Sequence, residues 1–313
     1  MKIDNNKYDF NLLKDNIKIW ALELGLQQTG ITDINLASEN THFKTWLEKN
    51  YQANMHYLEN NFEKRMHPEK LVPNTCRIIC CSLHYSPPEN NSKNIIAAYA
   101  RGHDYHKILR KRLQKLAQKI KIECADLEYR VFCDSAPVLE KSLAAKCGLG
   151  WIGKNNLLIN PKHGSYFFLG EIYINLPLPI DKPIKKLCGN CHRCIDACPT
   201  KALVEPNNLN ANRCISYLTI ENKDEIPDEL HKFIDNKVFG CDECQKSCPW
   251  NRFAKYTNDS ELQAFDHFKN LQLNEAATWD EKAFLKKTIG SPIRRSGFKC
   301  WQRNVKIALG NKR

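Results

Sequence analysis

Eight of the fifteen cysteines in this 313-residue chain fall into two short runs. The first run reads Cys188-x2-Cys191-x2-Cys194-x3-Cys198-Pro199, and the second reads Cys214 and then Cys241-x2-Cys244-x3-Cys248-Pro249. A cubane iron–sulfur cluster needs four converging thiolates, and two-residue gaps let one tight turn present three of them. The spacing therefore predicts a small module that holds two [4Fe–4S] clusters.

The ligand grouping follows from the Cys-Pro endings. In two-cluster ferredoxins the last cysteine of each run reaches the other cluster. We therefore place Cys188, Cys191, Cys194 and Cys248 on one cluster, and Cys198, Cys214, Cys241 and Cys244 on the other. Zinc is the alternative, because paired C-x2-C motifs also form tetrahedral zinc sites. The packed triplet and the repeated Cys-Pro ending favour clusters.

The length of the chain allows one large domain and a smaller one. We expect an N-terminal domain over 1–180, the cluster module over 181–255 and a basic helical segment over 256–313, with prolines at 177, 179 and 183 in the first linker. Helix-period and strand-period segments alternate before the linker. We assign the α+β class: an α/β-like layered N-terminal domain, a ferredoxin-like two-cluster module and a short basic helical C-terminal segment.

Individual elements can be placed by their periodicity. We expect helices over 10–26, 42–62, 104–124 and from near Pro137 to Cys147, and strands over 31–37, 77–85, 128–133, 156–159 and 165–175. Residues 94–100 could form a strand or a bent connector. Leucines line one face of the 104–124 helix and lysines recur on another, which favours a solvated outer face over a phosphate-binding one.

Charge is concentrated at the C-terminus. Ten Lys or Arg and no Asp or Glu lie between Lys282 and Arg313, in a chain of net charge +12. Phe284, Phe298 and Trp301 are interleaved with these charges, a combination that suits phosphate contacts and base stacking. A basic tail whose aromatic residues pack internally would look similar. The N-terminus does not resemble a signal peptide and no apolar stretch could span a bilayer, so we expect a cytosolic protein.

The clusters must serve a second centre, because they carry single electrons and have no substrate chemistry of their own. No C-x3-C-x2-C triplet indicates a radical enzyme and no G-x-G-x-x-G marks a dinucleotide fold. Asp104-Tyr105-His106 begins like a D-x-H-x-x-G cobalamin loop, but Leu109 stands in the glycine position, which argues against histidine ligation. The residues alone indicate a cytosolic two-cluster redox enzyme with a basic tail.

The chain resembles the epoxyqueuosine reductases, cobalamin-dependent iron–sulfur enzymes that complete queuosine synthesis at the wobble position of tRNA. The resemblance covers about 50–310, besides the two cysteine runs, in these stretches: Tyr99-Ala100-Arg101-Gly102-x-Asp104-Tyr105-His106, Asp134, Gly148-Leu149-Gly150-Trp151-x-Gly153-Lys154-Asn155, Arg213-Cys214-Ile215-Ser216-Tyr217-Leu218-Thr219, Cys248-Pro249-Trp250-Asn251, Gly290 and Arg303-Asn304.

The resemblance implies base-off cobalamin in the N-terminal domain, reduced by the clusters, and removal of an epoxide oxygen as water with two electrons and two protons. Asp134 matches the proposed proton donor; taken alone, it reads as a helix N-cap. To donate a proton at neutral pH, Asp134 would need burial to raise its pKa. Arg65, Asp134, Lys154 and Asn155 are the expected cobalamin contacts.

The resemblance also implies tRNA, through its anticodon stem–loop, and an external low-potential electron donor as partners. We expect a monomer with no membrane partner. Many members continue into a helical-repeat domain where this chain ends, so we expect tRNA contacts from Lys223, Arg294, Arg295, Lys299 and Arg303. The alternatives are an electron-transfer protein with no cofactor in its N-terminal domain, and a reductive-dehalogenase-like cobalamin enzyme.

Overall fold

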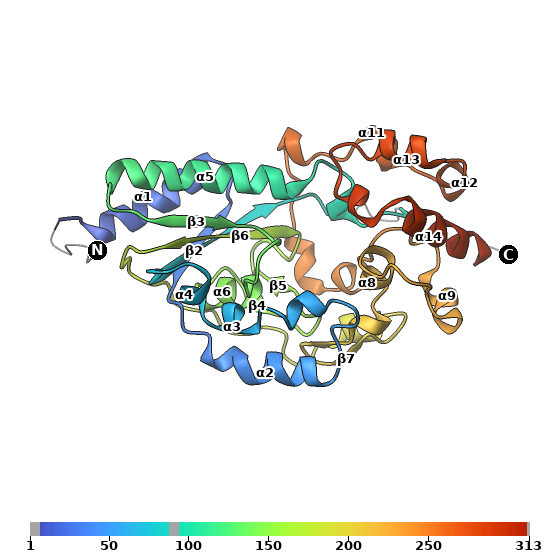
Figure 1. The fold of residues 1–313 in the computed structure, drawn as a ribbon, viewed down its shortest axis with the longest axis horizontal. Coiled ribbons are helices and arrows are strands. Elements are labelled where there is room, and N and C mark those ends of the chain that lie inside the picture. The colour runs from blue at the N-terminus through green and yellow to red at the C-terminus, as the bar shows by residue number, and fades with distance from the viewer. Residues whose placement is uncertain (1–6, 88–93, 312–313) are drawn as a thin grey trace.

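The structure is a computed structural model that describes residues 7–87 and 94–311. Its N-terminal part is built on a four-stranded antiparallel sheet (Figure 1). The strand order is β1 (Gln28–Thr32), β2 (Arg77–His84), β6 (Phe167–Ile174) and β3 (Tyr129–Phe132). The predicted strands over 77–85, 128–133 and 165–175 are confirmed. The strand predicted over 31–37 lies earlier, because the polar Gln28 and Thr29 pair with β2 at the sheet edge.

Helices cover both faces of this sheet. α1 (Phe10–Glu23) and α5 (Tyr105–Glu123) pack on one face, and α6 (Glu140–Lys146) packs on the other (Figure 1). On α5 the four apolar residues Leu109, Leu113, Leu116 and Ile120 are wholly buried, whereas Lys107, Lys111 and Lys115 are exposed. The predicted outer lysine face and the layered α+β architecture are therefore confirmed. Along the described ranges, no helix is both long and apolar enough to cross a bilayer.

Shorter elements connect the sheet to the cluster module. They are α2 (Ala37–Glu48), η1 (His56–Leu58), α3 (Phe62–Met66), α4 (Pro68–Leu71), η2 (Ala98–Ala100), β4 (Trp151–Ile152) and β5 (Leu158–Ile159). Residues 94–100 form the bent connector, in which Ile96 makes an isolated parallel bridge with Phe239. The Trp46 indole N–H donates to the Leu209 carbonyl, at 2.7 Å. Segments far apart in the sequence thus hold the module against the N-terminal part.

The module itself contains only short elements around the cysteines. They are α7 (Arg193–Asp196), β7 (Leu203–Glu205), β8 (Asn208–Leu209), η3 (Ala211–Arg213), α8 (Ile215–Ile220), α9 (Asp228–Ile234), α10 (Glu243–Lys246) and η4 (Pro249–Phe253). The Asn251 side chain accepts the Ser165 N–H at 2.7 Å. A Cβ on Gly164, whose φ is +69°, would lie 2.3 Å from that same amide oxygen, so glycine permits this close approach.

The basic C-terminal segment folds into its own helical layer. Its elements are η5 (Ser260–Leu262), α11 (Asp266–Lys269), α12 (Leu273–Ala277), α13 (Glu281–Lys287), η6 (Pro292–Ser296) and α14 (Phe298–Gly310). Trp301 stacks on Trp279 with ring centroids 5.1 Å apart, and Phe284 is wholly buried beside them. The expectation of stacking on bases is wrong for Phe284 and Trp301, because both are buried in the core of the layer; Phe298 is half-buried against that core.

Candidate active site and cluster-binding module

One pocket brings together residues from every part of the chain. Its polar lining consists of Tyr105, His106, Asp134, Cys214, Ser216, Tyr217, Glu221 and Arg295. Met55, Leu209, Ile220, Phe239 and Pro292 contribute apolar walls. A predicted cluster ligand, Cys214, therefore faces the same space as the predicted proton donor, Asp134.

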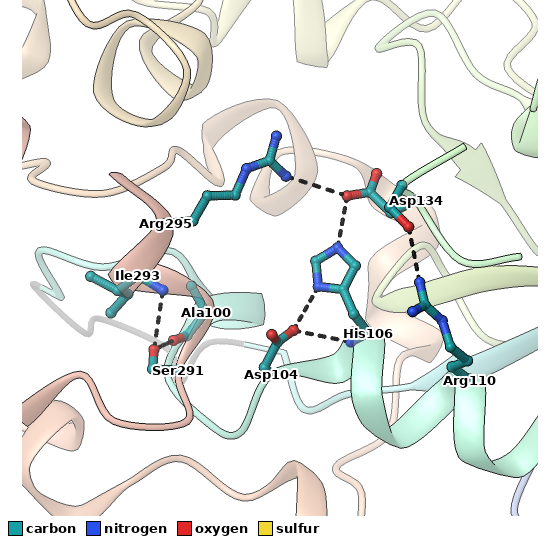
Figure 2. Close-up of polar contacts among 9 residues, drawn as sticks. Ala100, Asp104, His106, Arg110, Asp134, Ser291, Ile293 and Arg295 are labelled. Atoms are coloured by element: carbon teal, nitrogen blue, oxygen red, sulfur yellow. Dashed lines mark hydrogen bonds and ion pairs between the residues drawn. The ribbon is translucent and has the colours of Figure 1, made fainter. Parts of the chain in front are cut away.

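The C-terminal layer reaches this pocket through η6. The Asp104 N–H donates to the Gly290 carbonyl at 2.7 Å, and the Ser291 hydroxyl donates to the Ala100 carbonyl at 3.2 Å. These bonds tie η6 to the segment that enters α5 (Figure 2). Arg295 is thereby brought within 3.7 Å of the Asp134 carboxylate and 2.9 Å of Glu221.

His106 lies between two aspartates at the start of α5 (Figure 2). Its Nδ1 is 2.6 Å from Asp104 Oδ1, and its Nε2 is 2.8 Å from Asp134 Oδ2. Burial alone would lower the pKa of His106, but the hydrogen bonds to Asp104 and Asp134 outweigh it and raise the pKa from 6.5 to about 9. His106 is therefore an imidazolium at neutral pH, with both ring nitrogens donating.

Asp134 lies in the loop between β3 and α6, with a left-handed φ of +57°. The alternative of an N-cap is wrong, because α6 begins only at Glu140 and Leu139 is its N-cap residue. The hydrogen bond from His106 holds the pKa of Asp134 below its ordinary 3.8, although burial opposes this effect. Asp134 is therefore a carboxylate in this structure, with the proton on His106, and the rise in its pKa that burial beneath corrin and substrate would cause stays a prediction.

Arg65, an expected cobalamin contact, lies in α3 and is buried, with 7% exposure. Its Nη1 makes one long hydrogen bond of 3.5 Å to the Val138 carbonyl, and its Nε has no partner among the described residues. Tyr57 lies near enough to Arg65, Asp134 and Arg295 for their charges to affect its pKa. A buried guanidinium with so few partners is able to bind an additional polar group beside the Asp134 pocket.

The first cysteine group encloses a small pocket of its own. Cys188, Cys191, Cys194 and Cys248 all line it. Burial raises the pKa of Cys248, and Cys188 and Cys191 lie near enough to add to this effect. The Trp151 indole N–H donates to the Cys188 sulfur at 3.3 Å, the kind of bond that tunes a cluster's potential. The grouping of Cys248 with the first run is supported by this arrangement.

The four cysteines of the second group are all half-buried. Burial raises the pKa of Cys244, and Cys214, Cys241 and Cys198 lie near enough to raise it further. The Cys198 sulfur also accepts the Ala202 N–H at 3.2 Å. The neighbours of Cys214, at 215 and 217–219, are buried, whereas residues 187, 189, 190, 192 and 193 around the first group are exposed. The second group thus lies between the first group and the Asp134 pocket.

Lys154 and Asn155, the other expected cobalamin contacts, lie at the first cysteine group. Both line its pocket. The Lys154 ammonium donates to the Gly189 carbonyl at 2.8 Å, and the buried Asn155 side chain donates to the Cys244 carbonyl at 3.3 Å. These contacts support the cysteine loops. A contact with cobalamin stays a prediction for both residues.

The expected tRNA contacts separate into three kinds. Arg303 donates to the carbonyls of Leu218, Asn222 and Asp224, and Lys223 donates to those of Ile220 and Ser296. These bonds support the fold, and a contact with tRNA stays a prediction for both residues. Arg295 faces the Asp134 pocket. Arg294 and Lys299 are exposed and form no ion pair among the described residues, so they stay candidates.

Sequence reasoning missed His106 as a proton-holding residue. The Asp104-x-His106 spacing at a helix start was the available signal, and it also fitted capping or packing. The contact with Asp134, 28 residues away, is visible only in the fold. The role of Arg295 in the pocket was missed for the same reason.

Two protein families match parts of this chain. Residues 187–251 match the family described as "4Fe-4S double cluster binding domain". Residues 65–135 match the one described as "Epoxyqueuosine reductase QueG, DUF1730". The prediction of two [4Fe–4S] clusters is confirmed, and the zinc alternative is wrong. Among the described residues, no three His, Cys, Asp or Glu side chains could hold a single metal ion.

Whole-chain relatives agree with these matches. Epoxyqueuosine reductase of Pseudomonas aeruginosa is 48% identical over 96% of this chain and 85% of its own length. The Escherichia coli enzyme is 44% identical over 97% of this chain and 82% of its own length.

A crystal structure of epoxyqueuosine reductase with an epoxyqueuosine-modified tRNA-Tyr stem loop superposes with a TM-score of 0.91 at 30% identity, covering 97% of this chain and 82% of that chain. A second solved structure is that of the Bacillus subtilis enzyme with its catalytic aspartate loop swung out of the active site. It superposes with a TM-score of 0.90 at 29% identity and covers 97% of this chain and 82% of that chain. The chain belongs to the epoxyqueuosine reductase family.

Proposed function

We propose that this chain reduces epoxyqueuosine in tRNA to queuosine, in the cytoplasm. The epoxide oxygen takes up two electrons and two protons and leaves as water, while the two carbons that held it become an alkene. The reaction therefore needs electrons and protons at one place. The observation that carries the proposal is that Cys214 and the His106–Asp134 pair line the same pocket.

The residues present fit the clusters. Four thiols line one pocket, and the three other thiols of the second group lie around Cys244. The two clusters supply single electrons to the pocket beside Cys214. The proposed ligands are Cys188, Cys191, Cys194 and Cys248 for the first, and Cys198, Cys214, Cys241 and Cys244 for the second.

The proposal that the chain binds cobalamin depends on other features of the structure. The apolar walls of the Asp134 pocket suit a macrocycle, and the unpartnered Nε of buried Arg65 suits one of its polar side chains. When bound, cobalamin supplies a strongly reducing cobalt centre. Arg65 and Asp134 are the proposed contacts near that pocket; Lys154 and Asn155 are proposed from the resemblance alone.

The protons are delivered by the chain's own side chains. Asp104 fixes the His106 ring through Nδ1, so Nε2 points its proton at Asp134 Oδ2. Asp134, the more exposed of the pair, can take that proton and pass it to the epoxide oxygen. Arg295 beside it stabilises the carboxylate that remains.

Electrons enter at the opposite end of the module, according to this proposal. Between Lys182 and Ile195 the chain has four Lys or Arg and no Asp or Glu. These four side chains, Lys182, Lys185, Lys186 and Arg193, are exposed, and none forms an ion pair in the described part of the chain. They suit an acidic low-potential electron carrier docking over the first cysteine group. We propose Arg294, Arg295 and Lys299 for tRNA.

The decisive test is a single-turnover reaction. The reconstituted protein, cobalamin and a strong reductant are incubated anaerobically with tRNA that carries epoxyqueuosine, and its nucleosides are weighed by mass spectrometry. Loss of one oxygen from the nucleoside is expected. Intact nucleoside, with both clusters reduced and no cobalamin bound, would instead favour a two-cluster electron-transfer protein.

A further inference from the structure

Two glutamates, the half-buried Glu140 and the wholly buried Glu171, lie behind the Asp134 loop, and the chemistry proposed above uses neither. The Asp134 N–H donates to Glu140 Oε1 at 2.6 Å. Glu140 is the first residue of α6, and its carboxyl lies beside that of Glu171. Glu171 lies on β6, opposite Cys80 of β2 and Phe132 of β3. The backbone of the loop is thus connected to the centre of the sheet through two carboxyl groups.

Glu171 is in an apolar environment. Its exposure is 0%, and neither of its oxygens has a hydrogen-bond donor from any other described residue. The ionisable groups that affect this pair come from every packed element: Cys80 on β2, Tyr173 on β6, Lys141 and Cys147 on or after α6, Arg65 on α3, His106 on α5, and Asp134.

None of the cations in that set forms an ion pair with either glutamate among the described residues. The Lys141 ammonium donates to the Asn156 carbonyl instead, at 2.7 Å. Two carboxylates in contact inside a protein cannot both be charged, so the pair shares one proton. Burial raises the pKa of both groups. Glu140 accepts the Asp134 N–H, which favours its charged form, whereas Glu171 is wholly buried without a donor among the described residues, so Glu171 keeps the proton.

The conformation of the loop explains why support is needed. Asp134 has a φ of +57°, and the Ser135 N–H turns back to the Cys133 carbonyl at 2.6 Å. A residue other than glycine keeps such a conformation only when its surroundings impose it. In this conformation the carboxylate faces His106 and Arg295 (Figure 2).

We propose that Glu140 and Glu171 are a positioning pair for the catalytic loop. The protonated Glu171 donates to the Glu140 carboxylate, and Glu140 accepts the Asp134 N–H and holds the loop inward. This role rests on the proposed function only in assigning Asp134 to the reaction. The outward loop of the Bacillus subtilis enzyme is in keeping with a loop that needs such a hold.

The first test compares Glu140→Ala with Glu140→Gln in the cluster-loaded protein. Gln keeps an oxygen acceptor for the Asp134 N–H, whereas Ala removes it. By hydrogen-exchange mass spectrometry, amides 134–139 should exchange at least about tenfold faster in Glu140→Ala and at the wild-type rate in Glu140→Gln. Peptides from β6 and α5 should be unchanged in both, which controls for unfolding. Equal loop exchange in the wild type and Glu140→Ala would overturn the proposal.

The second test addresses the shared proton. At pH 7.5 the infrared carbonyl band of a protonated acid should disappear in Glu171→Gln, while the loop stays protected because the amide still donates to Glu140. Glu171→Leu should lose both the band and the protection. A band that persists in Glu171→Gln would refute the assignment of the proton. In turnover, Glu140→Ala should lower kcat without changing KM for tRNA. The exchange and infrared results do not depend on whether the chain is active.

Discussion

At the scale of single residues, the proposed chemistry depends on one proton shared by His106 and Asp134. The sequence suggested Asp134 as the donor and required its pKa to rise. The fold instead places a histidine between two carboxylates, which stabilises the imidazolium and the Asp134 carboxylate together. In this proposal the proton is held on His106, the more basic group, and is passed on through Asp134, the more exposed one.

This arrangement predicts how the reaction depends on pH. The rate should fall as pH rises through about 9, where His106 loses its proton. Asp104→Asn removes a negative charge that raises the pKa of His106, so the fall should occur at lower pH. Asp134→Asn should reduce turnover by about 10²–10⁴-fold with folding and cobalamin loading intact. Steady-state rates between pH 6 and 10 test these statements, and a wild-type rate in Asp134→Asn would contradict them.

The same pair predicts a stability effect with a defined sign. The folded pKa of His106, about 9, lies above its ordinary 6.5. Its contribution to the free energy of unfolding is therefore complete below pH 6.5 and lost as pH rises through 9. Urea unfolding of His106→Asn should show a larger destabilisation at pH 6 than at pH 9.5, and an equal loss at both would be evidence against the shared charge.

At the scale of elements, arginines near the C-terminus have different tasks that their spacing does not reveal. Arg303 of α14 reaches three backbone carbonyls at and beyond α8, the helix that follows Cys214. Arg294 of η6 is exposed. α14 is therefore a structural support for the cluster module, and η6 presents charge outward.

This division predicts opposite results for two arginine-to-alanine variants. Arg303→Ala leaves buried carbonyls without a donor and should destabilise the fold by at least about 1–3 kcal/mol. Arg294→Ala should leave unfolding unchanged but weaken tRNA binding, and its log–log salt slope should be flatter by roughly 0.7–0.9 for the lost phosphate contact. Denaturant melts and binding at several salt concentrations measure both. An unchanged slope would show that tRNA binds elsewhere.

At the scale of the whole molecule, the positions of the two cysteine groups suggest a direction for electron transfer. The first lies among exposed basic residues, and the second contributes Cys214 to the pocket where His106 and Asp134 meet. If electrons enter at the first group, as proposed above, the module separates electron entry from substrate chemistry, and neither partner needs to displace the other.

Charge reversal tests this direction. In Lys185→Glu/Lys186→Glu, reduction of the clusters by a reduced plant-type ferredoxin should be at least about tenfold slower at low salt, because electrostatic steering is lost. Photoreduced deazariboflavin, a small neutral reductant, should reduce both proteins at the same rate. Lys111→Glu/Lys115→Glu on the outer face of α5 is the matched control. Equal slowing in the control, or none in the variant, would place the docking surface elsewhere.

The clusters, the layered α+β architecture and the long helix of the N-terminal part can be predicted from the chain alone, because cysteine spacing and hydrophobic periodicity are local properties. The roles of His106, Arg295, Arg303 and Trp301 become visible only in the fold. Each role depends on a contact between residues far apart in sequence, and an exposed arginine cannot be told from a buried one by its neighbours along the chain. Glu171 is the clearest case, because this side chain becomes buried in an apolar environment only when the strands and helices have packed together.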